Sequence, residues 1–136
     1  MPTEHVNPET LIKNPAFTQV VTVSGPHKTI HVGGQDAIDA ATRTIIGTSD
    51  IRAQTTQVLK NLRAALNAAG ADLEHIVKWN VYVVHGQDVR AAFEVFMKEW
   101  GTRANPPAIS MLLVAGLANP DFLIEIDATA VVPADV

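Results

Sequence analysis

The sequence predicts an α+β fold in which two helices cover one face of a mixed β-sheet. Residues 50–70 and 88–101 repeat apolar side chains at the spacing of an amphipathic helix. Five shorter segments are rich in β-branched and apolar residues, as strands are, and the predicted order is ββαβαββ. The 136 residues contain no internal repeat and fit one domain over residues 1–136. Two helices can cover only one face of a sheet of this size.

The first two predicted strands, residues 20–23 and 29–33, form a hairpin. The segment between them, Ser24–Lys28, contains the Gly and Pro that mark turns. Residues 36–49 have a mixed pattern and predict a long connection. A loop of this length in a small domain is often functional or covers a site.

Both predicted helices carry start and stop signals. Ser49 or Asp50 can cap the free N–H groups of the first helix, and Gly70 fits the left-handed residue that ends it. Asp88 and Gly101 stand at the corresponding positions of the second helix. The remaining strands are expected at residues 76–84, 108–114 and 122–132, with a turn at 116–121.

Composition restricts the class of protein. Apolar residues make up 47% and charged residues 18%, which excludes a disordered chain. The net charge of −4 gives no basic excess for phosphate binding, so a nucleic-acid partner is not expected. The absence of cysteine excludes disulfides, thiolate catalysis and cysteine-bound metals. Because no apolar run reaches about 18 residues and the N-terminus lacks a signal-peptide pattern, we expect a soluble, cytoplasmic protein without a membrane partner.

The strand at residues 108–114 predicts self-association. Its two faces are both apolar, with Ile109, Met111 and Leu113 on one and Leu112 on the other. A strand that is apolar on both faces is usually buried on both faces, but two helices cover only one. We therefore expect other copies of the chain to cover the helix-free face and form an oligomer.

The last predicted strand offers candidate catalytic groups. Glu125 and Asp127 lie on one face of it, at a spacing that an acid–base pair could use. From the spacing alone, hydrogen bonds or salt bridges within an oligomer are the favoured explanation. No two histidines have the i, i+4 helical spacing of a zinc site with a carboxylate between them, and we predict no metal site.

Four segments resemble the RidA/YjgF/YER057c/UK114 (Rid) family. Residues 54–71 read QTTQVLKNLRAALNAAGA, which is similar to the family helix Q-x-x-x-x-L-x-N-L-x-x-x-L-x-x-A-G-A. The segments Ile76–Lys78 and Val81–Val83 resemble the strand that follows, and IEIDATA at residues 124–130 resembles the last strand. Asn14–Gln19 resembles the N-terminal segment that carries an aromatic residue. The resemblance covers nearly the whole chain.

The resemblance implies a chorismate-mutase-like fold of the bacillus type. It also implies a homotrimer whose sheets face inward, with ligand clefts between adjacent subunits. The best-known members of the family hydrolyse reactive 2-imino or 2-amino-alkenoate acids to 2-keto acids and ammonia without a cofactor. Some members have been called endoribonucleases or translation inhibitors. The implied partners are the chain itself and a small molecule in the cleft.

The chain departs from the family at the anion-binding arginine. The family pattern Pro-Ala-Arg-Ser reads Pro-Ala-Ile-Ser here, so Ile109 stands where the arginine would grip a substrate carboxylate. The resemblance places the other cleft positions of the family as follows. The cleft cysteine of the family falls on Met111, and its Ser-Gly pair falls on Gly33 and Gly34. The aromatic residue falls on Phe17, and the water-positioning carboxylate falls on Glu125.

The resemblance therefore predicts a deaminase-like hydrolase of an imine, enamine or related small carbonyl compound, with Glu125 orienting water. Because Ile109 cannot bind an anion, we expect a neutral or more apolar ligand. Another cation could replace the arginine: Arg103 in the preceding loop, or Arg43 or Arg52 of a neighbouring subunit. The alternative is a non-catalytic trimer that binds a small molecule or a partner protein. The net charge disfavours an endoribonuclease.

Overall fold

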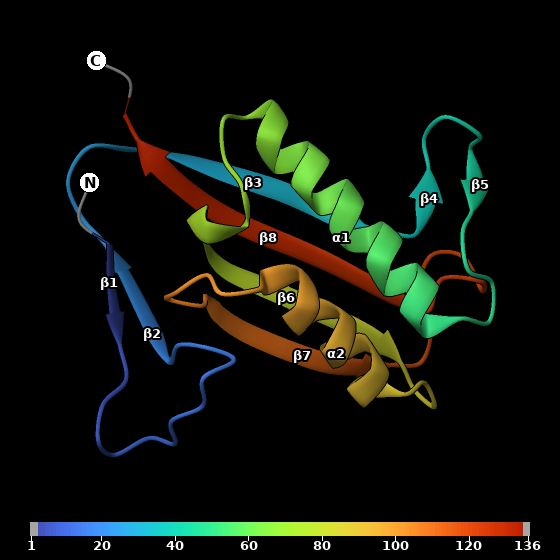
Figure 1. The fold of residues 1–136 in the computed structure, drawn as a ribbon, viewed down its shortest axis with the longest axis horizontal. Coiled ribbons are helices and arrows are strands. Elements are labelled where there is room, and N and C mark those ends of the chain that lie inside the picture. Colours follow the sequence, from blue (N-terminus) through green and yellow to red (C-terminus); the bar gives the residue numbers. More distant parts are fainter. Residues whose placement is uncertain (1–2, 135–136) are drawn as a thin grey trace.

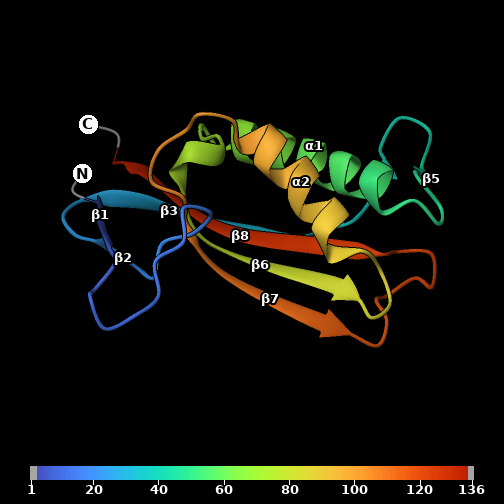
Figure 2. The same ribbon diagram turned by 60° about the horizontal axis from the view of Figure 1, so that its bottom comes forward.

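A computed structural model describes residues 3–134 and confirms the α+β class. Helices α1 (Ile51–Ala68) and α2 (Val89–Trp100) lie on one face of a four-stranded sheet (Figures 1 and 2). The strand order is β3-β8-β6-β7, in which β6 and β7 run parallel and the other two pairs are antiparallel. The four strands are β3 (His27–Gln35), β6 (Ile76–Val84), β7 (Ala108–Val114) and β8 (Ile124–Pro133).

Both helices begin and end where their capping residues place them. Asp50 and Asp88 each accept a 3.1 Å hydrogen bond from the backbone N–H three residues further on. Gly70 and Gly101, with φ of +84° and +67°, follow the last turns in a conformation that glycine adopts readily. Within residues 3–134, neither of these helices combines the length and apolarity needed to cross a membrane.

The core lies between the two helices and the sheet. Val58 and Leu62 of α1 are fully buried, and the ring of Trp79 in β6 lies 4.1 Å from that of Phe96 in α2. Alternate residues of β8 pack on the helices as predicted: Ile124, Ile126, Ala128, Ala130 and Val132. The intervening residues of β8, which include Glu125, therefore lie on the opposite face, which carries no helix.

The predicted hairpin of residues 20–23 and 29–33 is wrong. Strand β2 (Val20–Val23) pairs instead with β1 (Thr3–Val6), which was not predicted, in a separate two-stranded sheet (Figure 1). Strand β3 pairs antiparallel with β8, far away in the sequence. This pairing places Ile30 and Val32 in the core, each 8% exposed, and a local hairpin would not bury them.

The predicted long connection contains a small hairpin of its own. Strands β4 (Ile38–Asp39) and β5 (Thr44–Ile45) pair there, before α1 begins. A short 3-10 helix, η1 (Leu73–His75), precedes β6 as a single turn. Strand β8 begins at Ile124 instead of residue 122.

Strand β7 forms one edge of the sheet and keeps much of its apolar surface exposed. Met111, Leu112 and Leu113 are 50%, 46% and 56% exposed. Leu112 pairs with Tyr82 of β6, which in turn pairs with Glu125, so these three residues form a row on the helix-free face. A second copy of the chain would find both apolar side chains and an unpaired strand edge here.

Candidate functional site

Glu125 lies near the start of β8, and its side chain is half-buried. Gly34 lies beside it at a β-bulge, where the register of β3 with β8 shifts between Val32 and Gln35. A Cβ atom on Gly34 would stand 2.4 Å from Oε2 of Glu125, whereas a Cβ atom on Gly33 would meet nothing within 4 Å. Glycine at position 34 therefore makes room for the carboxyl group against the backbone of β3.

A second carboxyl group, that of Asp36, faces Glu125. The antiparallel register that pairs Gln35 with Ile126 places Asp36 opposite Glu125. Burial, a hydrogen bond with the Glu125 carboxyl and the charge of that group raise the pKa of Asp36 to about 7. Its Oδ1 is buried, and no N–H or hydroxyl group of residues 3–134 donates to it. A hydrogen bond between two carboxyl groups needs a proton on one of them.

Helix α1 holds the backbone around Asp36 in place. Nδ2 of Asn61 donates to the carbonyl oxygens of Asp36, at 2.9 Å, and of Ile38, at 2.8 Å. A shallow groove of about 450 Å³ lies between this part of α1 and the end of β3, and Gly34 contributes to its lining. The sequence gives no sign of the Asp36–Glu125 pair, because only the register of two distant strands brings the two residues together.

Asp127 does not serve as the partner of Glu125. It accepts a hydrogen bond from Nδ2 of Asn80 at 2.8 Å and another from the hydroxyl group of Tyr82 at 3.0 Å. The hydrogen bond to Asp127 raises the pKa of Tyr82, and the charges of Asp127 and Glu125 add to this effect. Each oxygen of Asp127 is thus bound by a side chain of β6, and the spacing of the two acids along β8 has a structural explanation.

Ile109 and Met111 face the helix side of the sheet, opposite to Glu125. Both line an apolar cavity of about 40 Å³ between α2 and the sheet. Met111 and Phe93 of α2, 50% and 46% exposed, form the accessible part of this lining. Among its lining residues only Thr55 has a polar side chain, so the cavity suits an apolar group and not an anion.

One chain does not bring the two halves of the predicted cleft together. Strands β3 and β7 form opposite edges of the sheet, three strand spacings or about 14 Å apart. Gly33, Gly34 and Glu125 lie toward the β3 edge, whereas Ile109 and Met111 lie on the β7 edge. A single pocket that includes all of them needs the β7 edge of one copy close to the β3 edge of another.

Phe17 belongs to the part of the predicted cleft that lies at the β7 edge. The next residue, Thr18, is 3% exposed; its backbone N–H donates to the carbonyl of Pro107 at 3.2 Å and its hydroxyl group to that of Pro106. These bonds hold the segment that carries Phe17 beside the residues leading to Ile109. Thr18 is a positioning residue that no motif in the sequence indicates.

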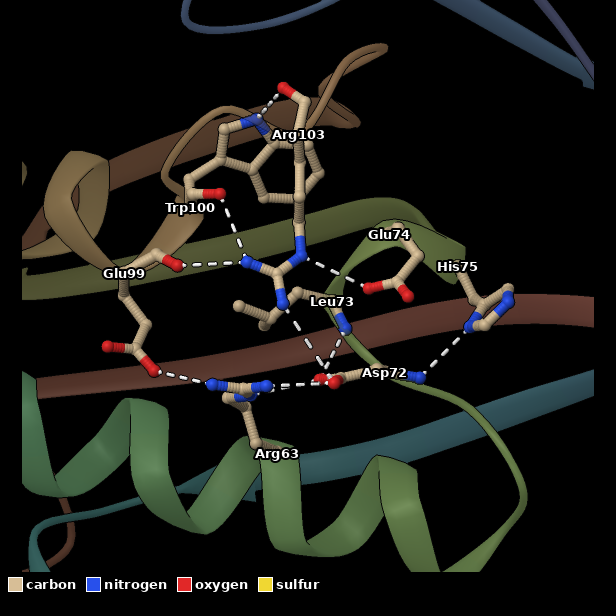
Figure 3. Close-up of polar contacts among 8 residues, drawn as sticks. All are labelled: Arg63, Asp72, Leu73, Glu74, His75, Glu99, Trp100 and Arg103. Atoms are coloured by element: carbon tan, nitrogen blue, oxygen red, sulfur yellow. Dashed lines mark hydrogen bonds and ion pairs between the residues drawn. The ribbon is translucent and has the colours of Figure 1, made fainter.

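Arg103 is held elsewhere and does not replace the missing arginine within its own chain. Its Nε donates to Glu74 at 3.1 Å, and its Nη1 donates to the carbonyl oxygens of Glu99 and Trp100, each at 3.1 Å (Figure 3). Glu74 belongs to η1, which immediately precedes β6, whereas Glu125 lies beside the far end of that strand. Arg103 therefore joins the loop after α2 to η1.

Arg103 belongs to a cluster of ion pairs centred on Arg63 of α1. Arg63 binds both oxygens of Asp72, at 2.9 and 2.8 Å, and Oε1 of Glu99 at 2.9 Å (Figure 3). Asp72 also accepts from the backbone N–H of Leu73 and so begins η1. The hydrogen bonds from Arg63 lower the pKa of Asp72. This cluster connects α1, α2 and η1 at a distance from the carboxyl pair.

Replacing Arg63 with alanine is expected to lower the free energy of unfolding by about 1–2 kcal/mol at neutral pH. The Arg63 and Asp72 side chains are 34% and 25% exposed, and solvent weakens the pair accordingly. Because the pKa of Asp72 is lowered by folding, this stabilisation is complete above its ordinary value of 3.8 and disappears as the pH falls through the folded value. Urea unfolding at pH 7 and near pH 2, with Arg63→Lys as the control that keeps the charge, measures the effect. An equal loss at both pH values would contradict this account.

Comparison with known proteins agrees with the fold. A family model described as endoribonuclease L-PSP matches residues 11–132. The RutC family protein slr0709 of Synechocystis sp. is 36% identical over 117 residues, which cover 86% of each chain. A 2-iminobutanoate/2-iminopropanoate deaminase of Salmonella typhimurium is 39% identical over 101 residues, or 72% of this chain and 75% of that protein.

A solved structure extends the match over the complete fold. The YyfB protein of Yersinia pestis, described as a member of the conserved Rid family of unknown function, is 36% identical to this chain. The two structures superpose with a TM-score of 0.82 over 97% of this chain and 100% of that one. Sequence and structure together show that the chain belongs to the Rid (RidA/YjgF) family.

Proposed function

We propose that this protein is a cytoplasmic Rid-type hydrolase that acts on a neutral imine, enamine or related small carbonyl compound. The observation that carries the proposal is the placement of Glu125 against Gly34. Neither Glu125 nor Asp36 forms an ion pair with any cation of residues 3–134, so no such pair blocks the carboxylate from accepting a proton. The relatives named as 2-iminobutanoate/2-iminopropanoate deaminases support the reaction class.

Glu125 acts as the base in the proposed reaction. Its carboxylate takes a proton from water as the water oxygen forms a bond to the C=N carbon, and the nitrogen gains a proton. The protonated Glu125 then gives its proton to the amino nitrogen, the new hydroxyl group loses its proton to water, and the C–N bond breaks, which leaves a carbonyl compound and ammonia. Backbone groups near Gly33, Gly34 and Met111 bind the polar end of the ligand.

Ile109 changes the substrate preference. The small apolar cavity that Ile109 and Met111 line offers nothing to a carboxylate. Losing one charged contact to a carboxylate costs roughly 2–5 kcal/mol, which is about 30-fold to several thousand-fold in affinity. The proposed substrates are therefore imines or enamines without a carboxylate next to the reacting carbon.

The proposed pocket forms between adjacent copies of a homotrimer. The sheet order separates the β3 and β7 edges, and the exposed apolar residues of β7 offer the contact surface. In this arrangement, Glu125 of one copy and Ile109 of the next line the same pocket.

The test measures ammonia release from a freshly generated neutral ketimine and from 2-iminobutanoate. The wild-type protein is expected to favour the neutral compound, and Glu125→Ala is expected to lose about 10²- to 10⁴-fold in rate. Glu94→Ala, which removes an exposed carboxylate of α2, is the matched control and should retain the rate. Equal rates for wild type and Glu125→Ala would rule out Glu125 as the base.

The second candidate is a non-catalytic trimer that binds a small molecule. The apolar surroundings of Ile109 favour it, because they can contact a ligand but offer no reacting group. Saturable ligand binding without turnover in the same assay would identify this case. An endoribonuclease is disfavoured, since a net charge of −4 and two adjacent carboxyl groups repel phosphates.

A further inference from the structure

Asp36 stands out because it takes part in none of the ion pairs found within residues 3–134. It faces Glu125 across the β3–β8 ladder, and its buried Oδ1 receives no hydrogen bond from an N–H or hydroxyl group of the described residues. Gly34 leaves the space that lets the Glu125 carboxyl lie this close to β3. Asp36 and Gly34 line an open groove beside α1, which gives a ligand access to the Asp36 side of the pair.

The pair does not contribute to folding as an ion pair would. Two carboxylates in contact repel each other, and removing the second proton from such a pair costs free energy. An asparagine at position 36 would offer its amide group to Glu125 without this cost. A site that brings two carboxyl groups together at a groove is instead suited to moving a proton.

We propose that Asp36 and Glu125 share a single proton in the neutral pH range, and that Asp36 is a positioning residue for the base of the proposed hydrolysis. The protonated Asp36 carboxyl donates to the Glu125 carboxylate and fixes its orientation toward the attacking water. This inference rests on the proposed function. The pair then carries one net negative charge, which disfavours an anionic ligand, in agreement with Ile109.

The groups that face the pair define its pH behaviour. Besides Glu125, β8 contributes Asp127 on the same face of the strand. Strand β6 contributes the neutral hydroxyl group of Tyr82, and α1 contributes the neutral amide of Asn61. Above the pKa of Asp36, near 7, Asp36 is charged and no longer donates the hydrogen bond that orients Glu125. Activity should therefore fall on the alkaline side of neutral pH.

The first experiment follows the carboxyl carbons of Asp36 and Glu125 by ¹³C NMR from pH 3 to pH 10. In the wild type we expect the pair to release its two protons in separate steps, the second near neutral pH. In Glu125→Gln the Asp36 step should move down by at least about one pH unit, because the repelling charge is gone. Release of both protons below about pH 5 in the wild type would overturn the shared proton.

The second experiment compares the pH profiles of kcat/KM for wild type and Asp36→Asn with the neutral ketimine. We expect the alkaline limb near pH 7 to disappear in Asp36→Asn, while the control Asp39→Asn keeps the wild-type profile. If the alkaline limb of the kcat/KM profile is unchanged in Asp36→Asn, Asp36 is not a positioning residue for Glu125. If the NMR titration shows the shared proton but no substrate turns over, the proposed function fails while the pair itself stands.

Discussion

Ile109→Arg is expected to raise kcat/KM for 2-iminobutanoate by about 10²- to 10³-fold. Ile109 lines the apolar cavity at the β7 edge, and the resemblance places the anion-binding arginine of the family at this position. A guanidinium group there can meet a carboxylate through two parallel hydrogen bonds, which the isoleucine cannot form. Ammonia release at fixed pH measures the gain.

Two further variants show whether the guanidinium itself produces the gain. Ile109→Lys supplies charge without the planar fork and should recover only part of the rate, whereas Ile109→Leu should change little. Far-UV circular dichroism of each variant checks that the fold is intact. A folded, oligomeric Ile109→Arg protein with no gain for the anionic substrate would show that the cleft has diverged beyond this one residue.

Leu112→Glu is expected to weaken the association of the proposed trimer by about 10²- to 10³-fold or more. Leu112 is 46% exposed on the helix-free face and lies in one row with Tyr82 and Glu125. A new carboxylate there would be buried without a partner when another copy covers the face, and it would add to the negative charge already present. Light scattering after size exclusion should show the mass falling from that of a trimer toward the 14.6 kDa of one chain.

The matched control for Leu112→Glu is Thr56→Glu, which adds the same charge on the exposed side of α1 and should leave the mass unchanged. A wild-type protein that has the mass of one chain at micromolar concentration would refute the trimer itself. A Leu112→Glu protein that remains fully assembled would place the contact surface on another part of the molecule.

Local features of the fold could be predicted from the sequence because they depend on neighbouring residues. Asp50 and Asp88 cap their helices through backbone groups only three residues away. The pairing of β2 could not be predicted in this way, since its turn signal is compatible with a hairpin and its actual partner is the N-terminal strand. Strand β3 pairs with β8 instead of β2, and β2 pairs with β1. This pairing depends on contacts between distant parts of the chain, which a local turn signal does not describe.

The same difference between local and long-range contacts decides which residues of the candidate site could be predicted. The resemblance indicated Glu125 and Gly34, and the structure places the two residues in contact. Asp36 was missed because it meets Glu125 only through the register of β3 with β8, after a bulge that shifts this register. Arg103 was a candidate by its position before β7, but its side chain binds carboxylate and carbonyl groups at the opposite end of β6.

The open edge of β7 also has a consequence for how the protein behaves when it is dilute or newly made. Among the strands of residues 3–134, β6 alone pairs with it, and the side chains at its centre are apolar and half exposed. Such an edge is a template on which strands from other molecules can stack without limit. Closed assembly would remove that template, so the association that we propose to build the pocket would also protect the chain from aggregation.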